Sequence, residues 1–165
     1  ICKFLRNLKK NTINNLLVRL HKGNKILNVV NEEKSKLLSI DKNMNIDDGD
    51  SDIGYLFNTS ELIIHSYDST GVLQTLSKNI PTLIFCSSGI DYLNDSSVKF
   101  YQLLIDVGIL HTTAQGLAKK IEKVTANVDE WWASNDIQIA RKEFCLQYAN
   151  TSSNHLSDLK KILGS

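Results

Sequence analysis

The stretch Glu61–Ser87, ELIIHSYDSTGVLQTLSKNIPTLIFCS, decides the fold of this chain. It begins with Leu62–Ile64, an apolar run long enough for a buried strand and too short for a core helix. Small and polar residues follow, and a helical pattern then runs to Asn79, before Pro81, the only proline of the chain, closes the helix. Thr82–Phe85 is a second buried strand. Strand, polar turn, helix and strand form one βαβ unit, which predicts a parallel sheet.

The composition is that of a single globular domain. A chain of 165 residues buries roughly 70% of its unfolded surface, and 42% hydrophobic and 22% charged residues are ordinary values. The net charge of +1 argues against a nucleic-acid partner, which normally meets a basic face. No apolar run approaches the roughly 20 residues of a membrane span. The three cysteines lack metal-ligand spacing, and we expect Cys86 and Cys145 to be reduced core residues of a cytoplasmic protein.

Short apolar runs alternate with helical patterns outside the central stretch, which predicts a Rossmann-like parallel α/β sheet flanked and closed by helices. The predicted strands, with their carboxyl ends on one edge, are Leu16–Leu20, Leu37–Ile40, Leu62–His65 and Thr82–Phe85. Ile109–His111 is a further short strand or extended piece. Ligands of open α/β sheets bind outside the carboxyl ends of the strands, so we expect the functional site at that edge.

Helices are predicted on either side of these strands. A short helix is expected over residues 2–10, and another around residues 53–57. Asp95 can cap a helix that Gly108 ends. Thr112 and Gln115 have the spacing of a capping box at the start of the next helix. The chain from Trp131 onward reads as helical.

The turn from Ser66 to Gly71 is the first candidate site. Free backbone amides at the start of a helix carry partial positive charge and attract phosphate, and nearby hydroxyl groups add donors. Ser66, Ser69 and Thr70 would then be phosphate ligands, and Gly71 would permit close approach. The alternative is that Ser69 or Thr70 only caps the helix.

Arg19 and His21 form the second candidate site, just past the end of a predicted strand. A guanidinium and an imidazole there suit a diphosphate or a carboxylated sugar donor, and the alternative is a solvated strand end. His111 is a third candidate, and its alternative is a structural histidine bonded to backbone. His65, flanked by apolar strand residues, could equally be a buried histidine whose hydrogen bonds are made within the protein. The run Asp48–Asp52 starts like a calcium loop but lacks its glycine and its final glutamate, which argues against a metal site.

Several stretches together resemble a family of transferases of surface-carbohydrate biosynthesis. They are VRLHK at 18–22, HSYDSTGVLQTLSKNIPTLIF at 65–85, YQLLIDVGILHTTAQGLAKKI at 101–121 and WWASNDIQIARKEFCLQYA at 131–149. The resemblance spans roughly residues 17–149, and residues 66–85 are its most specific part. Such proteins are similar to GT-B glycosyltransferases and to polyglycerolphosphate-type transferases, in which the C-terminal Rossmann-like domain holds a nucleotide-activated donor.

The resemblance implies a donor site made of a basic motif after an early strand and of polar residues on the first turns of a helix. Its members would be Arg19, His21, Ser66, Ser69, Thr70 and Gln74. Gln74 stands where the family pattern carries Glu, whose carboxylate accepts hydrogen bonds from ribose hydroxyls. Gln74 can still hydrogen-bond, without the charge.

We expect residues 1–165 to be one Rossmann-like domain, the C-terminal half of a GT-B architecture and a fragment of a longer chain. The chain begins at Ile1, and its only methionine is Met44. GT-B catalysis also needs an N-terminal acceptor domain as a partner. We therefore assign no catalytic residue, and we expect residues 1–165 alone to show no transferase turnover.

The expected function is binding of a nucleotide-sugar or nucleotide-activated polyol for surface polysaccharide synthesis. This donor is a substrate, and no cofactor is expected. One alternative is a non-catalytic nucleotide- or sugar-binding module on the same scaffold, and another is a GT-B-type sugar-nucleotide epimerase. An upstream α/β domain in the full reading frame would favour an enzyme over a module.

Overall fold

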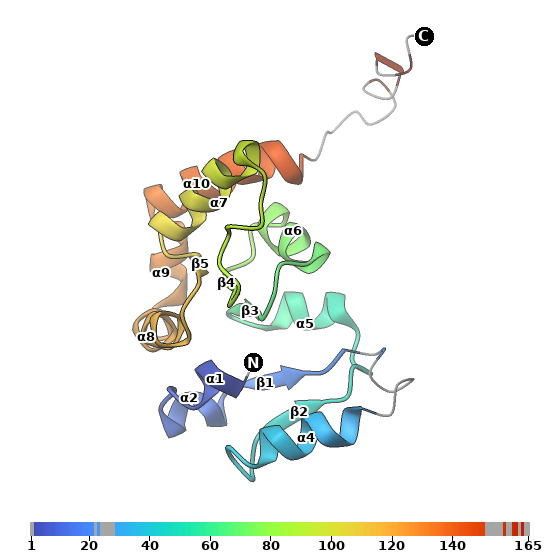
Figure 1. Cartoon of the computed structure of the whole chain (residues 1–165), viewed down its shortest axis with the longest axis vertical. Coiled ribbons are helices and arrows are strands. Elements are labelled where there is room, and N and C mark those ends of the chain that lie inside the picture. The colour runs from blue at the N-terminus through green and yellow to red at the C-terminus, as the bar shows by residue number, and fades with distance from the viewer. Residues whose placement is uncertain are drawn as a thin grey trace.

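The computed structural model describes residues 2–21, 23 and 29–150, and residues 157, 160, 161 and 163 near the carboxyl end. Two small sheets form its frame (Figure 1). In one sheet, β1 (Leu17–Arg19) pairs with β2 (Asn45–Asp47). In the other, β3 (Ile63–His65), β4 (Thr82–Phe85) and β5 (Leu110–His111) pair in chain order. Every pair is parallel, which confirms the α/β class, but the strands lie in two sheets where a single sheet was expected.

Helices connect and cover these strands, and none of those that the structure describes is both long and apolar enough to cross a bilayer. Their bounds are α1 (Cys2–Leu5), α2 (Lys10–Asn14), α4 (Val30–Leu38), α5 (Ile53–Thr59), α6 (Thr70–Ser77), α7 (Asp95–Asp106), α8 (Ala114–Val124), α9 (Val128–Ala133) and α10 (Asn135–Tyr148).

One strand prediction was wrong. Leu37–Ile40 is not a strand, because Leu37 and Leu38 form the last turn of α4, and the second strand of the chain is β2. The exposed face of α4 carries an ion pair between Lys36 Nζ and Glu32 Oε1, 2.6 Å apart and one helical turn away from each other. Leu37 is the buried residue of this helix. The apolar run therefore marks where a polar helix meets the core.

Two helix caps lie one residue from their predicted positions. Asn94, not Asp95, caps α7, and Thr113, not Thr112, caps α8; each cap side chain accepts a hydrogen bond from the amide three residues on. Gly108 follows the end of α7 with φ +73°, a left-handed conformation that glycine adopts without strain, so the predicted end of this helix is confirmed.

Both faces of β4 are covered, and all four of its residues are buried. Leu83 and Phe85 join a hydrophobic cluster with α1 and α8. Ile84 points to the opposite face, as alternation along a strand requires, and joins a second cluster with α6, α7 and α10. Cys86 and Cys145 are buried free thiols in this second cluster, as expected.

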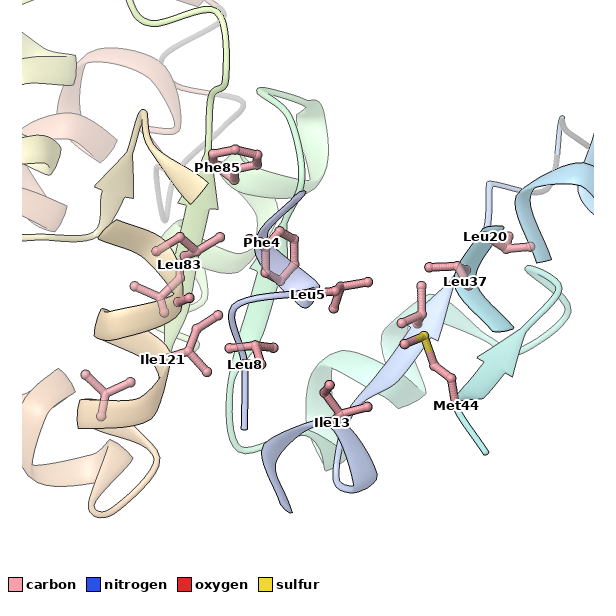
Figure 2. Close-up of a cluster of buried hydrophobic side chains, with 14 residues drawn as sticks. Phe4, Leu5, Leu8, Ile13, Leu20, Leu37, Met44, Leu83, Phe85 and Ile121 are labelled. Carbon is pink, nitrogen blue, oxygen red and sulfur yellow. The ribbon is translucent and has the colours of Figure 1, made fainter. Parts of the chain in front are cut away.

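Side chains of α1 connect the two sheets. Phe4 meets Phe85 edge-on, with ring centroids 5.9 Å apart. The same cluster takes Leu20, Leu37 and Met44 from the side of β1, α4 and β2 (Figure 2). The sheets are therefore joined by apolar packing through α1.

The carboxyl end of α6 is held by α9 and α10. The indole of Trp132 donates to both the backbone oxygen and Oδ1 of Asn79, each at 3.0 Å. Arg141 is 8% exposed, and its Nη1 donates to the backbone oxygen of Leu76 at 2.8 Å. Asn79 itself has φ +58°, which asparagine tolerates better than most residues. The Arg141 bond satisfies a carbonyl group in the last turn of α6, and the Trp132 bonds hold the turn that follows the helix.

Candidate functional site

A pocket of about 210 Å³ opens where β3 and β4 end. The loop after β3 and the end of β4 with the loop that follows provide its walls. The lining residues are Ser66, Tyr67, Asp68, Phe85, Cys86, Ser87, Ser88 and Tyr92. The pocket is thus at the carboxyl edge of two neighbouring parallel strands, the edge expected for a ligand site. Another hollow, of about 240 Å³, lies before β3 between Glu61 and residues 125–129, away from this edge.

Asp68 is held in the pocket wall by a tyrosine from a distant element. The Tyr101 hydroxyl, on α7, donates to Asp68 Oδ2 at 2.6 Å. Tyr101 in turn packs edge-on against Phe144, with ring centroids 5.2 Å apart. Burial, and then the bond to Asp68, raises the pKa of Tyr101 far above its usual value, so this phenol stays a donor. The contact fixes one carboxylate oxygen.

Cys86 and Tyr92 also line the pocket, Cys86 buried and Tyr92 exposed at the rim. Burial raises the pKa of the Cys86 thiol, and the charge of Asp68 raises it further. Burial likewise raises the pKa of Tyr92, with Cys86 and Asp68 adding to the effect. Both groups are therefore protonated at neutral pH and act as weak donors, and Cys86 lacks the thiolate character of a nucleophile.

The turn before α6 borders the pocket. Ser69 has extended backbone angles (φ −146°, ψ 166°) at the N-cap position, yet its side chain makes no capping hydrogen bond. Its backbone oxygen accepts from the amide of Val72. Across the described residues, the amides of Thr70 and Gly71 have no protein acceptor, and Thr70 is exposed. The side chain of Ser69 therefore does not cap α6, which was the alternative that the sequence left open for this residue.

Gly71 lets α6 approach β3. A Cβ atom at this position would lie 2.9 Å from Cε1 of His65, a distance that real Cβ contacts do not show. Nε2 of His65 lies 3.1 Å from Oγ1 of the buried Thr75, within hydrogen-bond distance. The same ring packs edge-on against Phe57. The close approach seen at Gly71 is that of a partly buried, hydrogen-bonded histidine, close to the buried, satisfied histidine that the sequence allowed for His65.

The partly buried His65 predicts a pH-dependent stability. Burial lowers the pKa of His65 from 6.5 to about 4. The unfolded chain therefore binds a proton on His65 more tightly than the folded chain does. The contribution of the neutral ring to the stability of the fold is complete above pH 6.5 and is lost as the pH falls toward 4. We expect urea unfolding to show a loss of about 2–3 kcal/mol between pH 7 and pH 4.5. His65→Gln, which retains a side chain able to bond Thr75, should remove this part of the pH dependence. Equal slopes for both proteins would contradict the assignment.

Arg19 and His21 make contacts within their own part of the fold. Arg19 Nη2 donates to the backbone oxygens of Gly49 (3.2 Å) and Ser51 (3.4 Å), and its Nε lies 3.4 Å from Oδ2 of Asp47. The guanidinium thus closes the loop after β2. His21 is exposed, and its Nδ1 accepts a hydrogen bond from the backbone amide of residue 23. Neither makes a described contact with the turn before α6.

Gln74 and His111 complete the predicted set. Gln74 is exposed one turn into α6. His111 stands at the carboxyl end of β5, with Nε2 3.1 Å from the backbone oxygen of Gly108, and burial lowers its pKa. The structure therefore brings Ser66, Ser69, Thr70 and Gly71 together, whereas His111 is bonded to its own turn.

Asp68, Ser87, Ser88 and Tyr92 line the pocket but were not among the predicted site residues. The two serines follow a predicted buried strand at the expected edge, which was an available signal. Asp68 lies within the Ser66–Gly71 turn that the sequence singled out, but its bond to Tyr101, 33 positions away, could not be predicted from a local pattern. In the described part of the chain, no three His, Cys, Asp or Glu side chains gather as metal ligands.

Comparison with protein families identifies a family for this chain. The family model described as LIC12162 family transferase matches residues 2–163. Neither curated proteins nor solved structures give a match.

Proposed function

The chain belongs to the LIC12162 family of transferases, and we propose that it binds a nucleotide-activated sugar or polyol at the carboxyl edge of β3 and β4. The observation that carries this proposal is the hydroxyl-lined pocket beside an uncapped helix start. A transferase must hold an activated donor, and this is where the described residues offer both a cavity and free donors.

The phosphate of the donor would bind the start of α6. The free amides of Thr70 and Gly71 point out of the helix end, where the helix dipole favours an anion, and the hydroxyls of Ser69 and Thr70 add donors. Such groups stabilise the negative charge that develops on a leaving nucleotide phosphate. Amides and hydroxyls supply this stabilisation, because the guanidinium of Arg19 is bound within the β1–β2 unit.

The resemblance of residues 65–85, 101–121 and 131–149 to transferases of surface-carbohydrate biosynthesis supports a polysaccharide as the product. In this proposal the acceptor is held by a second domain, as in GT-B enzymes, and the described residues provide the donor side.

Thr70→Ala tests the phosphate site. A hydrogen bond to a charged group contributes about 1.5–3 kcal/mol, so the substitution should weaken nucleotide binding roughly tenfold or more. Calorimetry with UDP, GDP, CDP and CMP measures the effect. Ser77→Ala removes a hydroxyl from the other end of the same helix, where it bonds the backbone oxygen of Gln74, and should leave affinity unchanged. If Thr70→Ala binds as tightly as the parent, the hydroxyl of Thr70 is not a phosphate ligand.

A further inference from the structure

We infer that the pocket beside α6 receives an uncharged, hydroxyl-rich group, a neutral sugar or polyol, and that Asp68 rejects a carboxylated one. This inference rests on the proposed function and adds the substrate class to it.

The charge of the pocket favours a neutral ligand. Of the described residues that line it, Asp68 alone is charged, and the others offer hydroxyl, thiol and aromatic groups. The partner of Asp68 is the neutral hydroxyl of Tyr101. An uncompensated carboxylate in a partly buried site repels a second carboxylate, because the lower dielectric strengthens the interaction between them. Arg19, the cation that could have accepted a carboxylated sugar, is bound to the loop after β2.

The hydrogen-bonding groups of the pocket suit a polyhydroxylated ligand. Tyr101 engages Oδ2 of Asp68, so Oδ1 remains as an acceptor for ligand hydroxyls. Ser66, Ser87 and Ser88 can each donate and accept, which matches the dual character of a sugar hydroxyl.

The rim and the size of the pocket suit a single ring. Tyr67 and Tyr92 are each 58% exposed, so their aromatic faces are available to pack on the apolar face of a sugar. The volume of about 210 Å³ is below the roughly 300–1,000 Å³ of pockets that enclose drug-sized ligands. One ring or a short polyol fits this description better than a whole nucleotide. The same carboxylate keeps phosphate out of the pocket and on the amide side of the turn.

Pairs of donors that differ by a carboxylate test the inference. Calorimetry on the 165-residue chain would compare UDP-glucose with UDP-glucuronic acid, and GDP-mannose with GDP-mannuronic acid. UDP, GDP, CDP and CMP alone are measured in parallel. We expect the neutral member of the bound pair to bind at least tenfold more tightly than its carboxylated partner.

Asp68→Asn should reduce that preference to about threefold or less, because the amide can still accept from Tyr101 but carries no charge. Asp91→Asn is the matched control. It removes a negative charge from the same loop as Tyr92, yet Asp91 is exposed and does not line the pocket, so the preference should remain. Thermal melting of both variants checks that they fold.

The outcomes separate this inference from the proposed function. If no nucleotide or donor binds, the proposed function fails and the inference fails with it. If nucleotides bind but the carboxylated donors bind as tightly as the neutral ones, the inference alone is overturned. A tenfold preference that Asp68→Asn retains would also overturn it, since the discrimination would then come from another group.

Discussion

Phe144→Ala should lower the free energy of unfolding by about 3–5 kcal/mol, the range measured for aromatic truncations in protein cores. Phe144 is fully buried in α10, between rings of Tyr101 and Tyr148 whose centroids lie 5.2 Å and 4.9 Å away. The remaining rings are fixed by their own contacts, so the site cannot collapse to fill the cavity. A domain is stable by only about 5–15 kcal/mol, so this single truncation removes a large part of the total. Urea unfolding followed by circular dichroism measures the loss.

Leu146→Ala is the control for this prediction. Leu146 lies on the same helix, two residues further along, and is 69% exposed. Its truncation should change the stability by no more than about 0.5 kcal/mol. Similar losses for Phe144→Ala and Leu146→Ala would show that α10 does not pack into the second cluster as described.

Leu5→Ala should lower the free energy of unfolding by about 3–4 kcal/mol, the middle of the range for buried leucines. Leu5 is fully buried in α1, within the cluster that connects the two sheets (Figure 2). The two sheets share no strand pairing, so this packing is a main contact between the β1–β2 unit and the rest, beside the bonds of Lys9 and Thr12 to Glu122 of α8. We therefore expect hydrogen exchange at the amides of Val18 and Leu20 to accelerate more than exchange within β4.

The control for Leu5→Ala is Leu38→Ala, at the end of α4, where the side chain is 39% exposed. It should cost no more than about 1 kcal/mol and should leave the exchange rates of Val18 and Leu20 unchanged. Unaltered exchange at these two amides in Leu5→Ala would contradict the role given to α1.

The β3–α6–β4 unit could be predicted because its signals are local. Two short apolar runs, a polar turn, a helical pattern and Pro81 lie within one continuous stretch, and α6 begins at Thr70, as expected. The strand β2 gave no such signal, since Asn45 and Asp47 surround a single apolar residue, Ile46. A strand of a two-stranded sheet needs little apolar surface. Short apolar runs, such as the one at the end of α4, fit strand and helix equally well by periodicity.

The candidate site could be predicted by its edge but not by its full composition. The polar turn after β3 is where the pattern indicated it. The partners of Arg19 could not be read from the sequence, because its guanidinium bonds the backbone oxygens of Gly49 and Ser51, which any residue would offer. The bond between Asp68 and Tyr101 depends on how α7 packs, which is a tertiary property.

The contacts at the carboxyl end of α6 bear on how this family can diverge in sequence. Arg141 bonds the backbone oxygen of Leu76, so this hydrogen bond places no requirement on the side chain at position 76, which is constrained only by its fully buried place in the second cluster. Asn79, at φ +58°, can give way to glycine, which keeps both the backbone angle and the backbone acceptor for Trp132. Among relatives of this chain, we therefore expect arginine and tryptophan to be retained at positions 141 and 132, while position 79 varies and position 76 stays apolar and of similar size.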